Sequence, residues 1–564
     1  MRDSIMNNED TDIYSQSAVA DGVEHAMVRV APGNAATPLQ HPNKRAAVQD
    51  KSNGNDGLRR WWTAPAGERP EQYHPILDVD GVSLSFVGRP LPGLWMEGDH
   101  LPGKGVADMP SAPGGMRQAG SRDQERTTRE EMADQQRKIK IAIVGGGIAG
   151  LALGAGLRKK EHIDFHIYES VPAYKDVGAG LALHMNAIKA MTLIGPEVRQ
   201  AYFSKAMEMG EEDKEMSTEV ILAHGPNQGE LVAELGKAKG RKTVSRADLL
   251  DGLLELVPKE NISFNKRLEK IEESNDGVRI TFKDGSEAHA DCMIGADGIH
   301  SATRSFILGP DHPATEPKNH DGWQIYRTMV TSEFAREHIN PKWTRTVPIL
   351  LGPRGHINTI PLNKGTRLSA GVAVRGVKFG TKGEVPDLDP EMYKDYSEDA
   401  QRIVRLVARD TSASWTAADH DHAPTYYKGC VAMMGDAAHA SMPFAGNGAA
   451  QALEDAAVLD HLFSKVTKPD QIGAAFSAYD ATRRPRSQAV VDLARKFGRI
   501  YAYAEDGMHE DPTKMKQFFG GAAGFTNNAD LQRQNDDAMK LFESAIGGDA
   551  NGTNGLAPEG VEVV

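Results

Sequence analysis

The segment of residues 139–150, IKIAIVGGGIAG, constrains the fold more than any other part of the chain. Its first six residues are almost all apolar and mostly β-branched, which predicts a buried parallel strand. Each glycine of the pattern that follows has a physical role: Gly145 permits a tight turn, Gly147 lets a pyrophosphate approach the backbone, and Gly150 lets helix and strand pack closely. The helix that begins here offers free N–H groups and the positive end of its dipole to a phosphate.

A second predicted strand, Asp164–Tyr168, ends at Glu169, nineteen residues beyond Gly150. An acidic residue at this distance typically accepts hydrogen bonds from the ribose of an adenosine dinucleotide. Because the chain has 57 glycines, a lone GxGxxG could arise by chance, and an ordinary βαβ unit without a nucleotide is the alternative. The strand before the motif and the acid after it favour the nucleotide-binding unit.

Two later segments place glycines and an acid where a ligand would approach. The segment VGAGLA at residues 177–182 contains Gly180 and Ala182, and its paired glycines bring the backbone close either to the same cofactor or simply to a loop. A short strand over 291–295 ends in Gly295-Ala296-Asp297-Gly298. Asp297 therefore follows the carboxyl end of a strand, where open α/β sheets place their ligands.

A helix is predicted to begin at Ser245-Arg246-Ala247-Asp248. Ser245 and Asp248 have the spacing of a capping box, with Asp in place of the usual Glu. Arg246 stands in the first turn, where a cation opposes the helix dipole. This position suggests that Arg246 faces an anion, and a solvated arginine is the alternative.

A third element, GDAAHASMPFAGNGAAQALEDA at residues 435–456, follows an apolar strand. With GxGxxG at 145–150 and GADGIHSATR at 295–304, it completes an ordered set that resembles the class A FAD-dependent aromatic monooxygenases, in particular the fungal salicylate hydroxylase-like family. The resemblance covers Ile139–Ala504. It implies an α/β fold: a doubly wound, glutathione-reductase-like Rossmann domain that binds FAD, interleaved with a β-sheet substrate domain and followed by a helical C-terminus.

The resemblance also implies a set of cofactor-binding residues: Gly145, Gly147, Gly150, Glu169, Gly180, Ala182, Arg246, Asp297, Asp436, Gly448 and Ala449. Within this set, Glu169 would bind the ribose of FAD, and Asp297 would lie near both FAD and the nicotinamide donor. Asp436 would hold the ribityl chain. Gly448 and Ala449 would lie against the pyrimidine ring at a helix N-terminus, whose dipole would stabilise negative charge on the reduced flavin.

The implied activity is the hydroxylation of a phenolic or other small aromatic molecule, in fungal secondary metabolism or in aromatic degradation. NAD(P)H would reduce FAD, O₂ would add to give a flavin hydroperoxide, and one oxygen atom would pass to an aromatic carbon. One alternative is a flavoenzyme of the same fold that epoxidises or oxidises a non-aromatic metabolite. Another is a non-catalytic binding protein that keeps the flavin fold and acts through its N-terminal arm.

Arg327 is the candidate residue that would face the substrate. It lies in Trp323–Val330, whose alternating pattern predicts a sheet strand, and it falls where the fungal relatives carry an arginine toward the substrate. A guanidinium there could pair with a phenolate or a carboxylate, and a surface cation at a strand edge is the alternative. Many salicylate hydroxylases have Pro-His where this chain has Pro443-Phe444, which favours an aromatic or polyketide phenol other than salicylate.

The composition of the chain limits the classes of partner that it can bind. The net charge of −13 argues against nucleic acid or an anionic membrane as the main partner, and no run approaches the ~20 apolar residues of a membrane span. The two cysteines, in a chain of 564 residues without a secretory signal, indicate a reducing, cytoplasmic setting. The chain is expected to be a monomer or a homodimer. No metal site is expected, because adjacent residues of the run DHDH at 419–422 point to opposite faces of an extended chain.

The expected organisation has five parts. These are a disordered N-terminal arm over 1–138, the first part of the FAD-binding domain over 139–322, a substrate-binding sheet over 323–430, the second part of the FAD-binding domain with C-terminal helices over 431–505, and a polar, partly disordered region over 506–564. Met132 begins a sequence typical of this fold. Residues 1–131 are therefore expected to be a dispensable arm or the result of an upstream start, with a partner-binding tail as the alternative.

Overall fold

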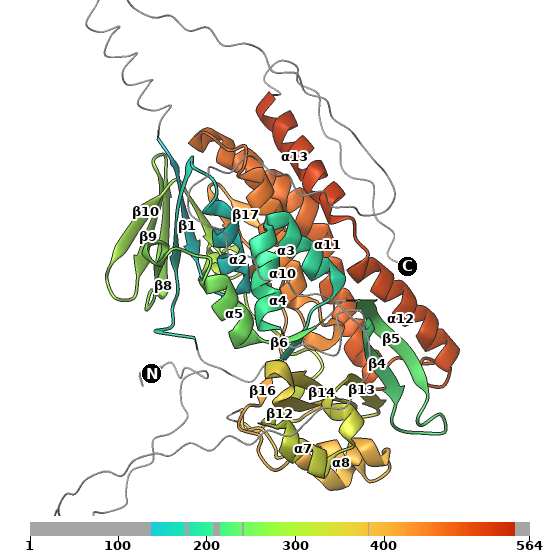
Figure 1. The fold of residues 1–564 in the computed structure, drawn as a ribbon. Helices are drawn as coiled ribbons and strands as arrows, with labels where there is room; N and C mark the ends of the chain where they lie inside the picture. The colour runs from blue at the N-terminus through green and yellow to red at the C-terminus, as the bar shows by residue number, and fades with distance from the viewer. Residues whose placement is uncertain (1–136, 175–179, 207–214, 240–241, 382, 548–564) are drawn as a thin grey trace, which may run out of the picture. The chain divides into compact units, whose positions relative to one another are not determined.

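The computed structural model of the chain describes residues 137–174, 180–206, 215–239, 242–381 and 383–547 (Figure 1). Almost all of the expected N-terminal arm lies outside these ranges. Two large sheets carry the fold, and each has its own hydrophobic core.

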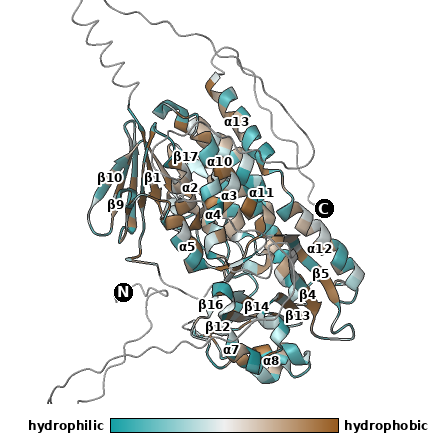
Figure 2. Cartoon of the chain, viewed as in Figure 1, coloured by the Kyte–Doolittle hydropathy of each residue, from teal (hydrophilic) through white to brown (hydrophobic). Residues whose placement is uncertain are grey.

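The first sheet has six strands in the order β17-β18-β11-β1-β2-β7. Their bounds are Tyr427–Lys428 (β17), Val431–Met433 (β18), Cys292–Gly295 (β11), Ile139–Val144 (β1), Ile163–Tyr168 (β2) and Ile262–Ser263 (β7). All neighbours pair in parallel except β17 with β18. Five of the six residues of β1 are buried, and Figure 2 colours this strand brown almost throughout, as expected for a parallel strand covered on both faces.

Different elements cover the two faces of this sheet. Helices α2 (Ile148–Leu157), α3 (Met185–Ile194) and α10 (Gly448–Leu462) lie on one side of β1, and the antiparallel strands β8 (Leu268–Ser274), β9 (Gly277–Phe282) and β10 (Glu287–Ala290) lie on the other (Figure 1). The helices pack against one another as well, since α10 contacts both α2 and α3. This is the doubly wound FAD-binding domain that the sequence predicts.

The second sheet has seven strands in the order β16-β12-β15-β14-β13-β4-β5. Their bounds are Trp415–Thr416 (β16), Gln324–Thr331 (β12), Arg367–Val374 (β15), Gly355–Leu362 (β14), Val347–Gly352 (β13), Glu215–Leu222 (β4) and Leu231–Lys239 (β5). One face packs on helices α7 (Ser332–His338) and α8 (Glu398–Val407). The other packs on α11 (Ile472–Tyr501) and on the segment around Phe444.

The substrate sheet does not begin at residue 323, as the sequence suggests. Strands β4 and β5, from the part assigned to the FAD-binding domain, form one edge of this sheet, with β4 in parallel register with β13. The pairing joins Val220 to Ile349, far apart in the chain, and no local pattern encodes it. The two domains are thus interleaved, as predicted, but with a different boundary.

Of the C-terminal region expected to be polar and partly disordered, residues 548–564 lie outside the described ranges, and most of the part before them is helical. Residues 512–547 form two helices, α12 (Pro512–Asn527) and α13 (Leu531–Gly547). Their buried residues follow helical spacing, with Met515 and Phe519 in one core and Leu531, Ala538 and Phe542 in another. The polar composition therefore belongs to the outer faces of amphipathic helices. Among the helices that the structure describes, none is long and apolar enough to cross a membrane.

Candidate active site

Four neighbouring strands of the first sheet end together at one edge. β1 is in register with β2 and β11, and β11 with β18, so that Val144 lies beside Tyr168 and Gly295. The segments that follow these strands carry the candidate residues Gly145, Glu169, Asp297 and Asp436. Parallel α/β sheets bind ligands at this carboxyl edge.

The three glycines of the first motif meet different surroundings. Gly145 has φ +110°, and a Cβ added there would collide with the carbonyl oxygen of Ala296. A Cβ on Gly150 would collide with the carbonyl oxygen of Gly145. By contrast, nothing lies within 4 Å of the position of a Cβ on Gly147, the residue before α2. Gly145 and Gly150 are therefore required by the fold, whereas Gly147 borders an open space at a helix N-terminus that can take a pyrophosphate.

The Glu169 carboxylate is fixed above the glycine loop. One oxygen accepts the Gly146 N–H at 2.7 Å, and the other accepts the Val171 N–H at 2.9 Å and the Ser170 hydroxyl at 3.0 Å. The Tyr174 hydroxyl donates to the Gly146 carbonyl at 2.5 Å. The acid that follows the second strand thus lies directly against the glycine-rich turn, as the dinucleotide-binding pattern requires.

Asp436 faces an opening in a densely packed part of the protein. Asp436 itself is exposed to solvent, although every other residue from 431 to 440 is buried. Desolvation by the surrounding protein raises the pKa of its carboxyl, and the charges of His439 and Arg246 oppose this shift. An exposed carboxyl in such surroundings lines a recess rather than the outer surface.

Arg246 interacts electrostatically both with Tyr174, which contacts the glycine loop, and with Asp436. It is the first residue of helix α5 (Arg246–Leu254), and the Ser245 hydroxyl accepts the Asp248 N–H at 3.0 Å, which confirms the predicted cap. Its positive charge acts on both the Tyr174 phenol and the Asp436 carboxyl. Arg246 is exposed and close enough to Asp436 to interact with it electrostatically, so that it is available to the anions predicted to bind there.

The carboxylate of Asp297 holds its own loop. It accepts the Ser301 hydroxyl at 2.6 Å and both the N–H and the hydroxyl of Thr303, at 3.0 and 3.1 Å. Arg304, fully buried in helix α6 (Ala302–Leu308), then donates to the carbonyls of Ala437 and Ala438, at 3.0 and 2.7 Å. Arg304 thus ties the Asp297 loop to the segment after Asp436, a role that its position in the motif alone did not reveal.

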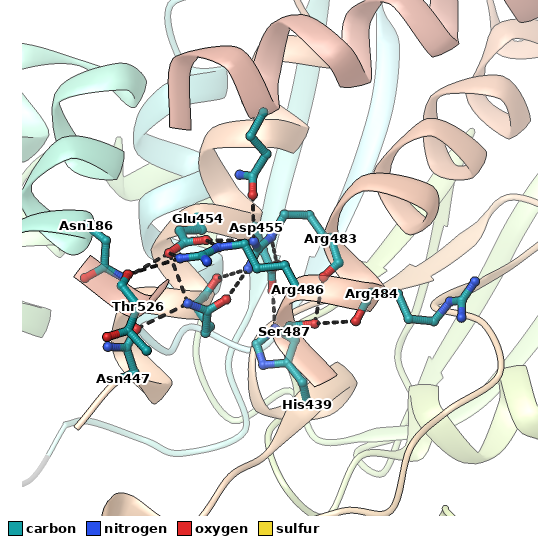
Figure 3. Close-up of polar contacts among 12 residues, drawn as sticks. Asn186, His439, Asn447, Glu454, Asp455, Arg483, Arg484, Arg486, Ser487 and Thr526 are labelled. Atoms are coloured by element: carbon teal, nitrogen blue, oxygen red, sulfur yellow. Dashed lines mark hydrogen bonds and ion pairs between the residues drawn. The ribbon is translucent and has the colours of Figure 1, made fainter. Parts of the chain in front are cut away.

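Behind the Asp436 turn lies a buried network of ion pairs (Figure 3). The Asp455 carboxylate accepts the Gly435 N–H at 2.8 Å and lies 2.6 Å from His439 Nε2 and 2.8 Å from Arg483 Nε. Asp455, from α10, thus fixes both ends of the short helix that contains Asp436 (α9, Asp436–His439). His439 takes part as a structural hydrogen-bonding residue.

Glu454 extends the network to the N-terminus of α10. It accepts Arg483 Nη1 and Arg486 Nε, both at 2.7 Å, and Asn186 Nδ2 at 2.9 Å. Asn186, on α3, also donates to the side-chain oxygen of Asn447 at 2.9 Å. The start of α10, with Gly448 and Ala449, is therefore held from α3 and α11 together.

Acid is expected to weaken this network. Burial alone would raise the pKa of Asp455, but the charges of His439 and Arg483 outweigh it and lower the pKa from 3.8 to about 2. Because the folded pKa lies below the unfolded one, Asp455 stabilises the fold above about pH 4 and loses this contribution as the pH falls toward about 2, by about 2 kcal/mol. Urea unfolding between about pH 5 and pH 2 should show a shallower decline for Asp455→Asn than for the wild type; parallel declines would contradict this.

On the second sheet, Arg327 is a buried cation without a counterion in the part of the chain that the structure describes. It is 9% exposed, and burial lowers its pKa to about 10. Its Nη1 donates to Ser369 Oγ at 3.0 Å, and its Cζ lies 5.0 Å from the ring centre of Trp415. Among the described residues, no carboxylate lies within ion-pair distance and Nε has no hydrogen-bond partner. The position is suited to bind an anion.

A glycine makes room beside this arginine. Arg327 on β12 and Asn358 on β14 both lie opposite Gly371 of the strand between them. A Cβ on Gly371 would lie 2.8 Å from Asn358 Oδ1 and 3.6 Å from Arg327 Nη2. The two polar side chains therefore approach each other above Gly371, on the face of the sheet that also carries Ser369.

This face is turned toward the cofactor-binding motifs. Ala373, which continues the Gly371 row, shares a core with Met442 and Phe444 of the third motif. The short strand β3 (Gly180–Ala182) also joins the two parts, because a Cβ on Gly180 would lie 3.1 Å from Ile360 of β14. The structure thus brings Gly180, Ala182 and Arg327 to the side of the substrate sheet that adjoins the FAD-binding domain.

The glycine-rich turn, the acid after the second strand and the two later acid-bearing loops define a dinucleotide-binding flavoprotein with an added substrate sheet. Comparisons with known proteins specify this class. The FAD-binding domain family matches residues 138–494. The chain is 35% identical over 421 residues to 6-methylsalicylate 1-monooxygenase atA of Aspergillus terreus, covering 72% of this chain and 93% of the relative. It is 33% identical over 395 residues to a salicylate hydroxylase of Pseudomonas putida, covering 66% of this chain and 87% of that relative.

A solved structure supports the same assignment. The substrate complex of a salicylate hydroxylase superposes with a TM-score of 0.60 at 28% sequence identity, over 71% of this chain and 98% of that one. The chain therefore belongs to the FAD-binding domain family and is an FAD-dependent monooxygenase of the salicylate hydroxylase type. The open space at Gly147 and the exposed Asp436 in its recess fit FAD, the cofactor of the family, for which NAD(P)H is the typical electron donor.

Proposed function

We propose that this monooxygenase hydroxylates an aromatic compound that carries an acidic group, a carboxylate or a phenolate, and that Arg327 binds this group. The buried guanidinium, for which the described ranges offer no counterion, is the observation that carries the proposal. The relatives named for 6-methylsalicylate and salicylate act on aromatic acids of this kind. The natural substrate would then be an aromatic acid or phenol of fungal secondary metabolism or of aromatic degradation.

The chain's own residues would hold FAD along the carboxyl edge of the first sheet. The N–H groups around Gly147 would bind the pyrophosphate, and Glu169 would bind the ribose of the adenosine half. Arg246 and Asp436 interact electrostatically and are both exposed, and they would contact the phosphates and the ribityl chain. When bound, FAD supplies the electron transfer from NAD(P)H and the activation of O₂.

The remaining candidates would surround the flavin end. The backbone of Gly180 and Ala182 would approach from the substrate-sheet side, and Asp297 would lie near both FAD and the nicotinamide. Gly448 and Ala449 are at the N-terminus of α10, whose dipole favours negative charge on a reduced ring. The network of Glu454, Asp455 and Arg483 would keep this helix and the Asp436 turn in place, and the apolar face of the substrate sheet would exclude water.

Arg327→Met is expected to reduce kcat/KM with aromatic acids by about 100-fold, because the substrate anion would lie buried without a partner. Arg327→Lys keeps the charge but loses the planar fork and is expected to retain about a tenth of the activity. The measurement is substrate-dependent NADPH oxidation with product detection by mass spectrometry.

The matched control is Arg345→Met, at an exposed arginine before β13, which should behave as wild type. Equal activity of Arg327→Met and Arg345→Met toward aromatic acids would contradict the proposal. A substrate preference for neutral terpenoids over phenols would favour the non-aromatic alternative instead.

A further inference from the structure

The position that follows Pro443 carries a phenyl ring in place of the histidine of many salicylate hydroxylases. Phe444 is 4% exposed and packs on Trp323, with the ring centroids 4.4 Å apart. A Cβ on Gly498 of α11 would collide with Phe444, so that a missing side chain on the helix makes space for the ring. Phe444 has no polar atom, and it can neither accept a hydrogen bond from a substrate nor take up its proton.

A different histidine lies against this phenyl ring. His356 of β14 meets Phe444 edge to face, with the centroids 5.5 Å apart and the rings at 90°. It is 9% exposed, and its Nδ1 is buried without a hydrogen-bond partner among the described residues. A buried polar atom without a partner costs about 1–3 kcal/mol, and a ligand group that satisfied it would recover this energy.

His356 also belongs to the Arg327 side of the substrate sheet. It is two residues from Asn358, so that both side chains point to the same face, and it pairs with Ala373, two residues beyond Gly371. Burial and then the charge of Arg327 lower the pKa of His356 to about 3. The imidazole is therefore neutral at working pH, which leaves one ring nitrogen as a hydrogen-bond acceptor.

We propose that His356 accepts a hydrogen bond from a ring hydroxyl of the substrate and thereby takes the place of the histidine that is absent at position 444. The proposal rests on the proposed function, since it assigns a second contact in the same substrate site. The site would then recognise two features of one molecule, an acidic group at Arg327 and a hydroxyl at His356. An aromatic acid without the hydroxyl would leave the histidine unsatisfied.

Tyr501 is the other residue that could form a hydrogen bond with the substrate hydroxyl. Its ring centroid lies 5.1 Å from that of His356, it is fully buried, and its hydroxyl oxygen lacks a partner among the residues described. Because it neighbours His356 and belongs to α11 rather than to the sheet, Tyr501→Phe is the matched control.

The test is the equilibrium binding of three probes to the FAD-loaded enzyme. Binding is monitored through the change in flavin absorbance. The probes are 2-hydroxybenzoate, benzoate and phenol. In the wild type, 2-hydroxybenzoate should bind about tenfold more tightly than benzoate, the value of one net hydrogen bond. His356→Leu should abolish this preference and weaken the binding of phenol, whereas the binding of benzoate should stay unchanged. His356→Asn, whose amide oxygen can occupy the place of Nδ1, should restore part of the preference, and Tyr501→Phe should keep it.

An undiminished preference in His356→Leu, its loss in Tyr501→Phe, or equal affinities of the wild type for the two acids would overturn the proposal. Failure of the proposed function gives a different result. In that case Arg327→Met would leave the benzoate affinity unchanged, whereas the effect of His356→Leu on phenol would still report on the histidine.

Discussion

Gly147→Val is expected to yield a folded but colourless protein. A Cβ at this position meets nothing within 4 Å, and the backbone of Gly147, with φ −71°, is one that any residue adopts. The free energy of unfolding of the apoprotein should therefore change by less than about 1 kcal/mol. The isopropyl group would, however, fill the space that the pyrophosphate needs, and the affinity for FAD should fall by about 1,000-fold, or about 4 kcal/mol.

The prediction is checked by the flavin absorbance of the purified protein, by FAD titration and by thermal unfolding. Gly473→Val is the matched control, because Gly473 of α11 also has nothing within 4 Å but lies in another element, and it should retain yellow colour. Gly145→Val should instead unfold the protein, because φ +110° and the Ala296 carbonyl exclude a side chain there. Wild-type flavin content in Gly147→Val would show that the cofactor does not lie on this turn.

Arg483→Met is expected to destabilise the protein by about 3–5 kcal/mol, because it leaves buried carboxylates without their cation. Arg483 is fully buried and contacts Glu454 at 2.7 Å and Asp455 at 2.8 Å, and neither acid is exposed. Since the same acids hold the Asp436 turn and the start of α10, flavin retention should fall together with stability. Urea unfolding and flavin content measure the two effects.

The neighbouring residue provides the control for this variant. Arg484 pairs with Asp480 at 2.9 Å, and its side chain is 30% exposed, so that Arg484→Met should cost less than about 1 kcal/mol. Similar losses in the two variants would mean that the buried network has no special role. A stable Arg483→Met variant that released FAD would assign the network to cofactor positioning alone.

The cofactor-binding edge could be predicted from the sequence because its information is local. Each motif joins the end of a strand to the start of a helix, and parallel strands that end in register bring such segments together. The glycine pattern, Glu169 and the Ser245 cap are of this kind. The family resemblance then placed Asp436 and Arg246 on the same side, and the comparisons confirm that family.

What the sequence did not reveal depends on pairing between distant residues. Strand β4 pairs with β13, more than a hundred residues away in the chain, and the residue pattern of β4 does not indicate which strand it pairs with. The Arg483 network was hidden for the same reason, because its members come from four helices, α3, α9, α10 and α11. His356 looked like an ordinary strand residue, and only its contact with Phe444 relates it to the missing histidine.

The most direct test of the account is the fate of molecular oxygen. The FAD-loaded enzyme is incubated with NADPH and 2-hydroxybenzoate, or another hydroxylated aromatic acid that binds, under isotopically labelled O₂, and the product is analysed by mass spectrometry. The account predicts one labelled oxygen atom in each product molecule, with the amount of labelled product falling sharply in both Gly147→Val and Arg327→Met. Product oxygen derived from water, or NADPH oxidation that yields only hydrogen peroxide with every aromatic acid and phenol that binds, would contradict it.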